Sequence, residues 1–427
     1  MDEQPRDANP SGESAAEPET GVRLRHVPLA ILSASIPPDR SGQAVVLLRL
    51  LKSWDATDYC LLTSRRREAW ESASPDSGWL SGEYIFLPGF QPRAGPAPSS
   101  FGGRAVSKLR SAIALGLYLA GRTFRLVDAL RRRKVRLLLA CSGDPWDLPA
   151  AALASTILRI HFGVYLFDWY AYQWTGRTLR WIAQRLEPMI LRKAVTVVTH
   201  SLPLQEEVAR RYRIRAIHIP NPADESALSC PRPAQWPSSA DRATVLFAGA
   251  IYAANDDAIQ NLILAMKELS HVPLRFLVFS SQKPEWLVTA AEEGHLSLEG
   301  GVGATSVERV LQQADILFLP LTFRSSLREI VNTSVPAKMS DYLAMGRPIL
   351  VHAPKAAFVS QYFRAHDCGL VVSDNDPSML AAAIVHLLAT PDFGMTLGEK
   401  ARAWAHVDFD PEKSRDIFRA TLCPLLT

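Results

Sequence analysis

The sequence lacks the features that mark several protein classes. Its 427 residues include only five cysteines, scattered and without a C-x-x-C pair, which excludes a disulfide scaffold and favours reduced intracellular thiols. Cysteine and histidine show no zinc spacing. The longest apolar stretches, Ala112–Ala120 and Leu148–Leu158, fall short of the roughly 18 residues that a membrane-spanning helix needs.

The sequence also has no G-x-S-x-G, G-x-G-x-x-G or Walker motif, which argues against a hydrolase, a simple dehydrogenase and a nucleoside triphosphatase. Two D-x-D segments, at 374–376 and 408–410, fit a pattern that binds divalent metals. Each is followed by proline, however, which is typical of an aspartate that caps a helix with proline at its first position. We therefore predict no metal site.

The first 20 residues are acidic and polar, and they carry no secretory signal. This composition favours a disordered tail, which we place at residues 1–22. Without a secretory signal or a spanning helix, the sequence predicts a cytoplasmic protein, either free or peripheral at the inner face of the membrane.

Charge is unevenly distributed along the chain. Residues 1–240 carry 31 basic and 22 acidic side chains, whereas residues 241–427 carry 16 basic and 21 acidic ones. The segment 104–136 has ten basic residues and one acid, Asp128, interleaved with Leu, Ile, Tyr and Phe. A helix of this kind can lie on an anionic membrane surface, or it can pack on a sheet with its basic residues solvated. Both interpretations stay open, whereas nucleic acid is disfavoured because aromatic residues are sparse here.

Short apolar runs alternate with helical patterns along the whole chain. Residues 29–33, the loop with Gly42 and the apolar stretch 44–52 form a strand, loop and helix, which is how a Rossmann-like unit begins. After a proline-rich stretch the alternation restarts at Thr244. We predict an α/β protein with two largely parallel sheets, whose ligands sit at the carboxyl ends of the strands.

This pattern predicts a division of the chain into successive parts. They are an N-terminal domain at 23–225, a linker at 226–241, a C-terminal domain at 242–405 and a last helix at 406–427 that could pack back on the first domain.

The segment 336–348, PAKMSDYLAMGRP, is the most informative stretch of the C-terminal half. A helix that begins near Ala337 after a polar loop places free backbone N–H groups, Lys338 and the Ser334 hydroxyl around one point. A diphosphate favours such a place, because the helix dipole and the ammonium both attract anions. In the alternative interpretation Ser334 caps the helix, Lys338 is solvated and Asp341 only favours the first turn.

Four segments in order, at 247–266, 302–321, 335–350 and 368–388, resemble the nucleotide-sugar-binding domain of family 4 glycosyltransferases of the GT-B fold. The resemblance covers about residues 27–405. It implies two Rossmann-like domains that face each other across a cleft, and a hexosyltransferase-like enzyme of polysaccharide biosynthesis. Such an enzyme moves a sugar from a UDP- or GDP-linked donor to a glycan, lipid-linked or small-molecule acceptor. It retains the anomeric configuration and needs no metal or cofactor, since the nucleotide sugar is a substrate.

The resemblance also implies roles for residues around the predicted helix. Many members have two glutamates eight residues apart that contact the donor; here Thr333 replaces the first and Asp341 stands at the second. Asp341 would then hold the nucleotide ribose. Lys338 would face the diphosphate, with Ser334 beside it, and contribute to catalysis.

Further donor contacts are implied at the ends of three strands. The Arg…Lys pair that usually follows the first strand of this domain is absent, because Gly249 is followed by AIYAAND. Lys283 could substitute, although a surface lysine is equally compatible. Gly301 and Val302 fall where the family's loop contacts the base through its backbone, and the glycine could equally mark a turn.

In the N-terminal half the candidate acceptor site comprises Gly42, Asp168, Trp169 and His200. A carboxylate among aromatic rings suits a sugar acceptor, because rings stack on C–H faces and the acid orients or deprotonates a hydroxyl. Asp168 is therefore a second candidate catalytic residue. Alternatively, Asp168 caps a loop and His200 is structural.

Two other functions remain compatible with the sequence. A sugar-nucleotide epimerase of the same fold would convert its substrate with no acceptor present. A non-catalytic nucleotide-sugar-binding or scaffold protein would explain the missing first glutamate and the missing Arg…Lys pair.

Overall fold

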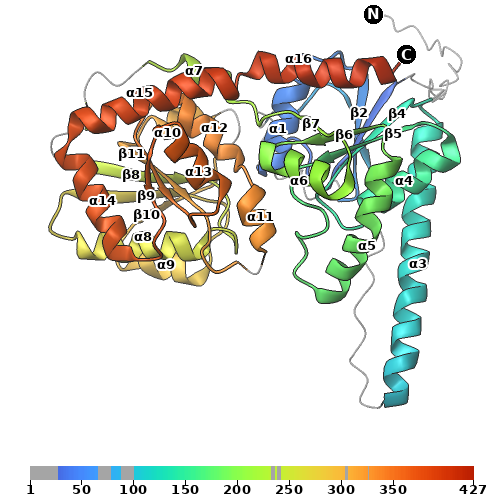
Figure 1. Ribbon diagram of the computed structural model, residues 1–427, viewed down its shortest axis with the longest axis horizontal. Helices are drawn as coiled ribbons and strands as arrows, with labels where there is room; N and C mark the ends of the chain where they lie inside the picture. The colour runs from blue at the N-terminus through green and yellow to red at the C-terminus, as the bar shows by residue number, and fades with distance from the viewer. Residues whose placement is uncertain are drawn as a thin grey trace, which may run out of the picture.

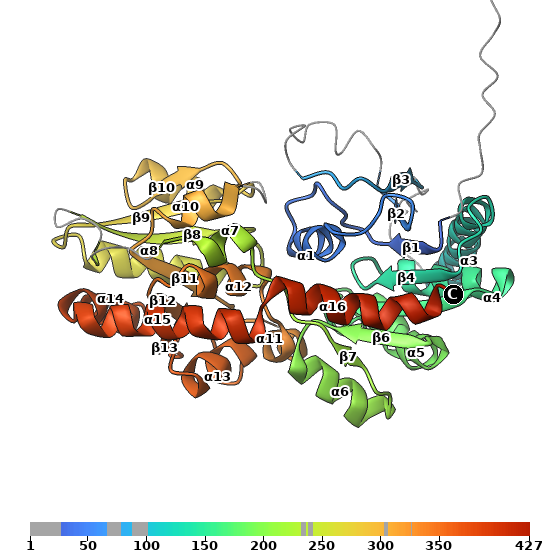
Figure 2. The ribbon, with the colours of Figure 1, turned by 90° about the horizontal axis from the view of Figure 1, so that it is seen from above.

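The computed structural model describes residues 27–65, 78–87, 101–231, 236–237, 242–302, 306–325 and 327–427, with side chains from residue 113 onward in the first long helix. The tail predicted at 1–22 lies outside these residues. The chain folds into two α/β domains, along which the last two long helices run (Figures 1 and 2).

The N-terminal domain is built on a seven-stranded parallel sheet with the order β3-β2-β1-β4-β5-β6-β7. Its strands are β1 Leu29–Leu32, β2 Tyr59–Thr63, β3 Glu83–Phe86, β4 Leu137–Cys141, β5 His161–Leu166, β6 Thr196–Thr199 and β7 Ile217–His218. Every residue of β1, β2 and β4 is buried, because helices cover both faces of a parallel sheet and its strands then need apolar residues throughout.

Helices connect these strands on either face of the sheet. They are α1 Gly42–Leu51, α3 Phe101–Arg131, α4 Asp147–Leu158, α5 Arg177–Lys193 and α6 Leu202–Tyr212. Ser41 caps α1, since its hydroxyl accepts a hydrogen bond from the Ala44 N–H. Two of these elements were not expected from the sequence: α6 is mostly polar, and β7 has only 2 residues.

The C-terminal domain has a six-stranded parallel sheet with the order β10-β9-β8-β11-β12-β13. Its strands are β8 Ala243–Ala248, β9 Leu274–Phe279, β10 Ser297–Glu299, β11 Ile316–Pro320, β12 Ile349–His352 and β13 Leu370–Val372. Its helices are α8 Asp256–Glu268, α9 Glu285–Glu292, α10 Val307–Leu311, α11 Arg328–Thr333, α12 Ala337–Ala344, α13 Phe358–Ala365 and α14 Pro377–Ala389. The prediction of a polar loop before α12 was wrong in one part, because the short helix α11 forms there. Burial of Val331 and Thr333 stabilises this helix.

The two domains are joined twice. The expected linker contains a short helix, α7 Glu225–Ser229, and α15 Pro391–Asp408 leads into α16 Pro411–Leu422 and the short 3-10 helix η2 Cys423–Leu425. Phe418 and Leu422 of α16 are buried in the same apolar cluster as Leu47 and Leu50 of α1. The last helix of the chain therefore completes the core of the first domain (Figure 2).

The D-x-D segments form helix caps, as predicted. Asp376 accepts a hydrogen bond from the Ser378 N–H at the start of α14, and Asp410 accepts one from the Lys413 N–H at the start of α16. Both helices have proline in the first turn.

Among the described residues, no single helix is long and apolar enough to cross a membrane; only α14 together with the helices after it meets that test, as a pair bent by 98°.

Candidate functional site

The domains meet at the connection between α11 and α12, residues 333–335, where the family's first glutamate would stand. The Ser201 hydroxyl donates to the Thr333 carbonyl oxygen over 2.7 Å, and the Asn221 amide donates to the Val335 carbonyl oxygen over 2.9 Å. The Val335 N–H in turn donates to Nε2 of His200 over 3.3 Å. Side chains of the N-terminal domain therefore fix the backbone of this connection.

The start of α12 also touches the start of α1. A Cβ atom placed on Gly42 would lie 3.0 Å from the Ala337 Cβ, so a larger residue at position 42 would push the two helices apart. Gly42 is the residue that the resemblance places in the cleft, and it allows this close approach.

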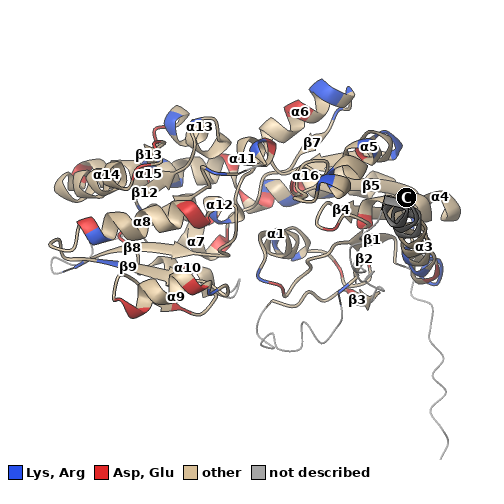
Figure 3. Cartoon of the chain, turned by 90° about the horizontal axis from the view of Figure 1, so that it is seen from below, with Lys and Arg blue, Asp and Glu red and all other residues tan. Residues whose placement is uncertain are grey.

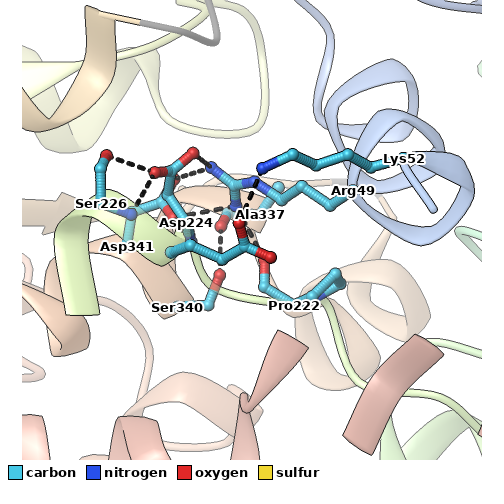
Figure 4. Close-up of polar contacts among 9 residues, drawn as sticks. Arg49, Lys52, Pro222, Asp224, Ser226, Ala337, Ser340 and Asp341 are labelled. Carbon is cyan, nitrogen blue, oxygen red and sulfur yellow. Dashed lines mark hydrogen bonds and ion pairs between the residues drawn. The ribbon is translucent and has the colours of Figure 1, made fainter. Parts of the chain in front are cut away.

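A buried ion pair crosses the same interface (Figure 4). Nη1 of Arg49 lies 2.8 Å from Oδ1 of Asp341, and Nη2 donates to Oδ2 over 3.0 Å. The Asp224 N–H donates to the same Oδ1 over 3.0 Å, and Arg49 also donates to the Pro222 carbonyl oxygen. Burial raises the pKa of Asp341, and the Arg49 guanidinium opposes that effect. Both carboxylate oxygens predicted to hold a ribose are thus bonded within the protein, and Asp341 is buried.

A cavity of about 260 Å³ lies between the domains. Its lining from the first domain includes Gly42, Asp168, His200 and Asn221, and its lining from the second includes Tyr252 and residues 334–337. The structure therefore gathers four predicted residues, Gly42, Asp168, His200 and Ser334, around one space, although they lie far apart in the sequence.

Asp168 lies just after β5 at this cavity. Its backbone is held by Ser142, whose hydroxyl donates to the Asp168 carbonyl oxygen over 3.0 Å. In the part of the chain that the structure describes, no hydrogen bond to the Asp168 carboxyl group is present. Burial raises the pKa of this carboxyl group to about 7. At neutral pH the group therefore exists in both protonation states, as a proton-transferring residue requires.

Trp169 lies beside the cavity but not in it. Its side chain is 1% exposed, and the Arg211 guanidinium covers its ring at 4.3 Å from the centroid. Its indole N–H donates to Glu187 over 2.8 Å. No ring face is open to a sugar, so the predicted stacking of Trp169 on an acceptor does not fit this structure; the residue anchors the loop that carries Asp168.

Glu187 is a residue of this site that the sequence reasoning missed. Its carboxylate is buried and accepts hydrogen bonds from Trp169 and from the Ala171 N–H over 2.6 Å, which fixes the loop after Asp168. Glu187 is the sole acid of α5. The sequence signal that could have identified Glu187 is that it is the single acid of a basic helix and falls on the buried side of that helix.

His200 forms hydrogen bonds in the interface between the two domains. Because Nε2 accepts the Val335 N–H, Nδ1 carries the proton and donates to the Leu166 carbonyl oxygen over 3.2 Å. Burial lowers the pKa of His200 to about 4, so the ring is neutral at physiological pH. Both ring nitrogens are occupied, which matches the structural interpretation of this residue and leaves none for an acceptor.

Lys338 lies in the first turn of α12, but it is half-buried and not exposed as a solvated lysine would be. Its Nζ atom lies over the Phe247 ring, 4.0 Å from the centroid, and a Cβ on Gly249 would come within 2.6 Å of it. Gly249 also has φ +144°, a backbone conformation that favours glycine. No carboxylate pairs with Lys338 among the described residues, and burial lowers its pKa to about 7.

The other predicted donor contacts follow the same edge of the sheet. Lys283 is exposed after β9, and Gly301 and Val302 follow β10. The Gly301 carbonyl oxygen accepts a hydrogen bond of 2.8 Å from Arg40 of the first domain. Gly249, Lys283 and Gly301 thus line the carboxyl ends of three neighbouring strands, β8, β9 and β10. Within the described residues no group of His, Cys, Asp and Glu is arranged to hold a metal ion.

Comparisons with known proteins agree with this architecture. Residues 242–390 match the sequence model of a family described as glycosyl transferases group 1. The chain is similar to the structure of Anabaena HepE in complex with UDP-glucose, with 16% identity, 93% of this chain and 100% of that one covered, and a TM-score of 0.65. No protein among the curated sequences matches the chain.

Two more solved structures share the fold. A glycosyltransferase from Rickettsia africae has 10% identity, covers 94% of this chain and 99% of its own, and gives a TM-score of 0.64. The sucrose-phosphate synthase of Thermosynechococcus elongatus has 15% identity, covers 93% and 100%, and gives a TM-score of 0.63. The predicted GT-B fold is confirmed, and the group 1 match over residues 242–390 is compatible with the resemblance to family 4 glycosyltransferases. Identities this low concern the fold alone.

Replacing Arg49 by methionine should destabilise the protein, because it leaves the Asp341 carboxylate buried without a counter-charge. The loss of one partner of a buried pair costs about 3–5 kcal/mol, and we expect a decrease of that size in the free energy of unfolding by urea. The double variant Arg49→Met/Asp341→Leu removes both charges and should recover most of it. A single variant as stable as the parent would contradict this account of the interface.

Proposed function

We propose that this chain, a group 1 glycosyltransferase with the GT-B fold, moves a sugar from a UDP- or GDP-linked donor to a hydroxyl of a glycan, lipid-linked or small-molecule acceptor. The proposed reaction retains the anomeric configuration and uses no metal. The observation that carries the proposal is the interdomain cavity, which residues 334–337 at the start of α12 line from one domain and Asp168 lines from the other. Lys338 follows directly in the first turn of α12, and among the described residues no carboxylate pairs with it.

The start of α12 suits the diphosphate of the donor. The first N–H groups of a helix have no partner within it, and the helix dipole adds partial positive charge at that end. Lys338 adds an ammonium whose position is fixed by Phe247 and Gly249. In the transfer step the bond between the anomeric carbon and the diphosphate oxygen breaks, and its electron pair goes to the diphosphate. Charge on the phosphate therefore increases in the transition state, where a fixed cation stabilises it most.

Asp168 suits the acceptor side of the reaction. The acceptor hydroxyl oxygen forms the new bond to the anomeric carbon and loses its proton, which passes to Asp168 or to the departing phosphate. A carboxyl group with a pKa near 7 can orient that hydroxyl and take up the proton at physiological pH. Ser142 and Glu187 hold its loop in place.

The similar structures give the first donor to test. HepE was crystallised with UDP, with UDP and glucose, and with UDP-glucose. Incubation of the chain with UDP-glucose or GDP-mannose should release the nucleoside diphosphate only when an acceptor is present, with or without EDTA. Conversion of the donor into an epimer with no acceptor would instead identify an epimerase, and no turnover with any donor would contradict the proposal.

Lys338→Ala should lower kcat/KM by about 10²–10³-fold, the effect of losing one preorganised electrostatic contact in a transition state. Steady-state kinetics of sugar transfer measure it. Lys283→Ala, a lysine that is exposed at the same edge of the sheet, is the matched control and should retain near-normal turnover. If the Lys283 variant loses activity and the Lys338 variant keeps it, the diphosphate assignment moves to Lys283.

Binding of UDP should be coupled to proton uptake by Lys338. The ammonium has a pKa of about 7 in the empty site, so above pH 7 the side chain is mostly neutral, whereas an anionic diphosphate favours its charged form. The Kd for UDP should therefore rise with pH between 7.5 and 9, by at most about tenfold per pH unit. Calorimetry in buffers of different ionisation enthalpy measures the uptake directly. Lys338→Ala should abolish the pH dependence and Lys283→Ala should keep it; an unchanged slope in the Lys338 variant would refute the linkage.

We also propose that α3 attaches the protein to an anionic membrane surface. The end of α3 that begins at Phe101 extends away from the rest of its domain (Figure 1). Ile113, Leu117 and Phe124 fall on one stripe of the helix and are 54%, 69% and 67% exposed. Figure 3 shows basic residues of α3 in blue, of which Arg125 and Arg131 are exposed. Exposed apolar residues with basic neighbours are typical of helices that lie in a membrane interface.

Some basic residues of the segment 104–136 form ion pairs within the protein and are not available to bind lipid headgroups. Arg122 is buried and forms ion pairs with Asp144 and Asp147, and Arg133 pairs with Glu83. These arginines hold α3 to its own domain. A test of membrane binding therefore has to change the exposed stripe.

The double variant Leu117→Glu/Phe124→Glu should bind vesicles containing phosphatidylglycerol at least about tenfold more weakly than the parent, because two apolar side chains can no longer insert. Co-sedimentation measures the binding. Ile157→Glu, at an exposed apolar position of α4, is the matched control and should bind normally. If the parent protein does not bind these vesicles, or if the double variant binds as well as the parent, α3 has no such role.

A further inference from the structure

The interdomain cavity contains polar groups that the protein itself leaves without partners. Asn221 is 3% exposed, and its amide nitrogen donates to the Val335 carbonyl oxygen, which fixes the orientation of the amide. Among the described residues the amide oxygen then has no hydrogen-bond partner. A buried acceptor left in this state costs about 1–3 kcal/mol, so a hydrogen-bond donor is expected to arrive with a ligand. Asp168 adds an uncommitted carboxyl group to the same lining.

The opposite wall carries an aromatic side chain in an unusual place. Tyr252 follows β8, where related proteins have the Arg…Lys pair, and it lines the cavity with 61% of its surface exposed. Its backbone is fixed at the start of α8: its N–H donates to Oδ1 of Asn255 over 3.1 Å, and its carbonyl oxygen accepts from the Asn255 N–H over 2.9 Å. Asp168 lines the same cavity from the opposite domain.

We infer that the cavity holds an uncharged pyranose ring of the donor and that Tyr252 is a specificity-determining residue, with its ring against a C–H face of the sugar. The inference rests on the proposed function and adds the class of sugar to it. Asn221 and Asp168 would accept hydrogen bonds from sugar hydroxyls, and the Ser334 hydroxyl would complete the set. An aromatic face with acceptors around it matches the apolar faces and the polar rim of a pyranose.

The position of the cavity favours the donor sugar over the acceptor. Residues 334–337 line it, and they lead into the first turn of α12, where the diphosphate is expected. The sugar is bonded directly to that diphosphate, so it is the first ring within reach of this space. The volume of about 260 Å³ lies just below the range of ligand pockets, roughly 300–1,000 Å³, and suits a single ring.

The charges of the lining favour a sugar without a carboxylate. Among the described residues, the charged side chains that line the cavity are Asp168 and Arg65, and Arg65 is paired with Asp39 over 3.5 Å. A sugar acid would bring its carboxylate near Asp168, and within this described lining the one cation is already paired. Like charges in a confined site disfavour binding.

Thermal shifts with nucleotides and nucleotide sugars test this inference. The probes are UDP, GDP, UDP-glucose, UDP-N-acetylglucosamine, GDP-mannose and UDP-glucuronate. In the parent protein, at least one nucleotide sugar whose sugar is uncharged should raise Tm more than the corresponding nucleoside diphosphate does. UDP-glucuronate should not raise Tm more than UDP does. Tyr252→Ala should weaken binding of that nucleotide sugar by about tenfold and leave binding of the nucleotide unchanged. Tyr252→Phe should keep most of the additional Tm shift that the sugar causes.

Trp181→Ala is the matched control, since Trp181 is 57% exposed on α5 and does not line the cavity. It should leave every shift unchanged. If no nucleotide and no nucleotide sugar binds the parent, the proposed function fails and this inference with it. If nucleotides bind but no uncharged sugar adds to the shift, if UDP-glucuronate adds as much, or if Tyr252→Ala changes both shifts equally or neither, the inference alone is overturned.

Discussion

The bidentate ion pair between Arg49 and Asp341 is the constraint on which the site depends. It joins α1 to α12 in a buried interface, and the backbone of Asp224 adds a further hydrogen bond to the same carboxylate. Removing one partner of such a pair leaves a buried charge without a counter-charge, which strongly destabilises the folded state. The start of α12 is therefore held against the Gly42 loop, and residues 334–337 of the second domain line the interdomain cavity together with Asp168 of the first. Asp341, which the family resemblance assigns to the donor ribose, has a structural role in this interface.

The substitutions relative to the family pattern form a consistent set. Where a first glutamate is usual, the connection at 333–335 is fixed by Ser201, His200 and Asn221 through its backbone. Where an arginine and a lysine are usual, the chain has a glycine that makes room for Lys338 and a tyrosine that faces the cavity. In the proposed donor site the cation is then Lys338, which is half-buried and whose pKa burial lowers to about 7.

Much of the fold could be predicted from the sequence, because parallel strands buried on both faces require continuous apolar runs that stand out between helices. Elements that obtain their stability from neighbours could not: α6, α11 and β7 are short or polar and form where other segments cover them. The candidate site divides in the same way. Residues at strand ends, such as Asp168 and Gly249, follow from topology. The partners of buried polar groups do not, since in the sequence Glu187 appears only as the single acid of a basic helix and Arg49 as the single charge of an apolar one.

The double connection between the domains has a mechanical consequence. The two crossings of the chain touch each other, since the Ala223 N–H donates to the Phe409 carbonyl oxygen over 2.9 Å. Two connections that touch at one point resist sliding of one domain past the other and leave rotation about that point as the easier movement. Rotation about this contact displaces the far rim, where Arg40 reaches Gly301, much more than the region near Arg49. An opening of the cleft about this contact would break the hydrogen bond from Arg40 to Gly301 first and would leave the buried pair of Arg49 and Asp341 in place.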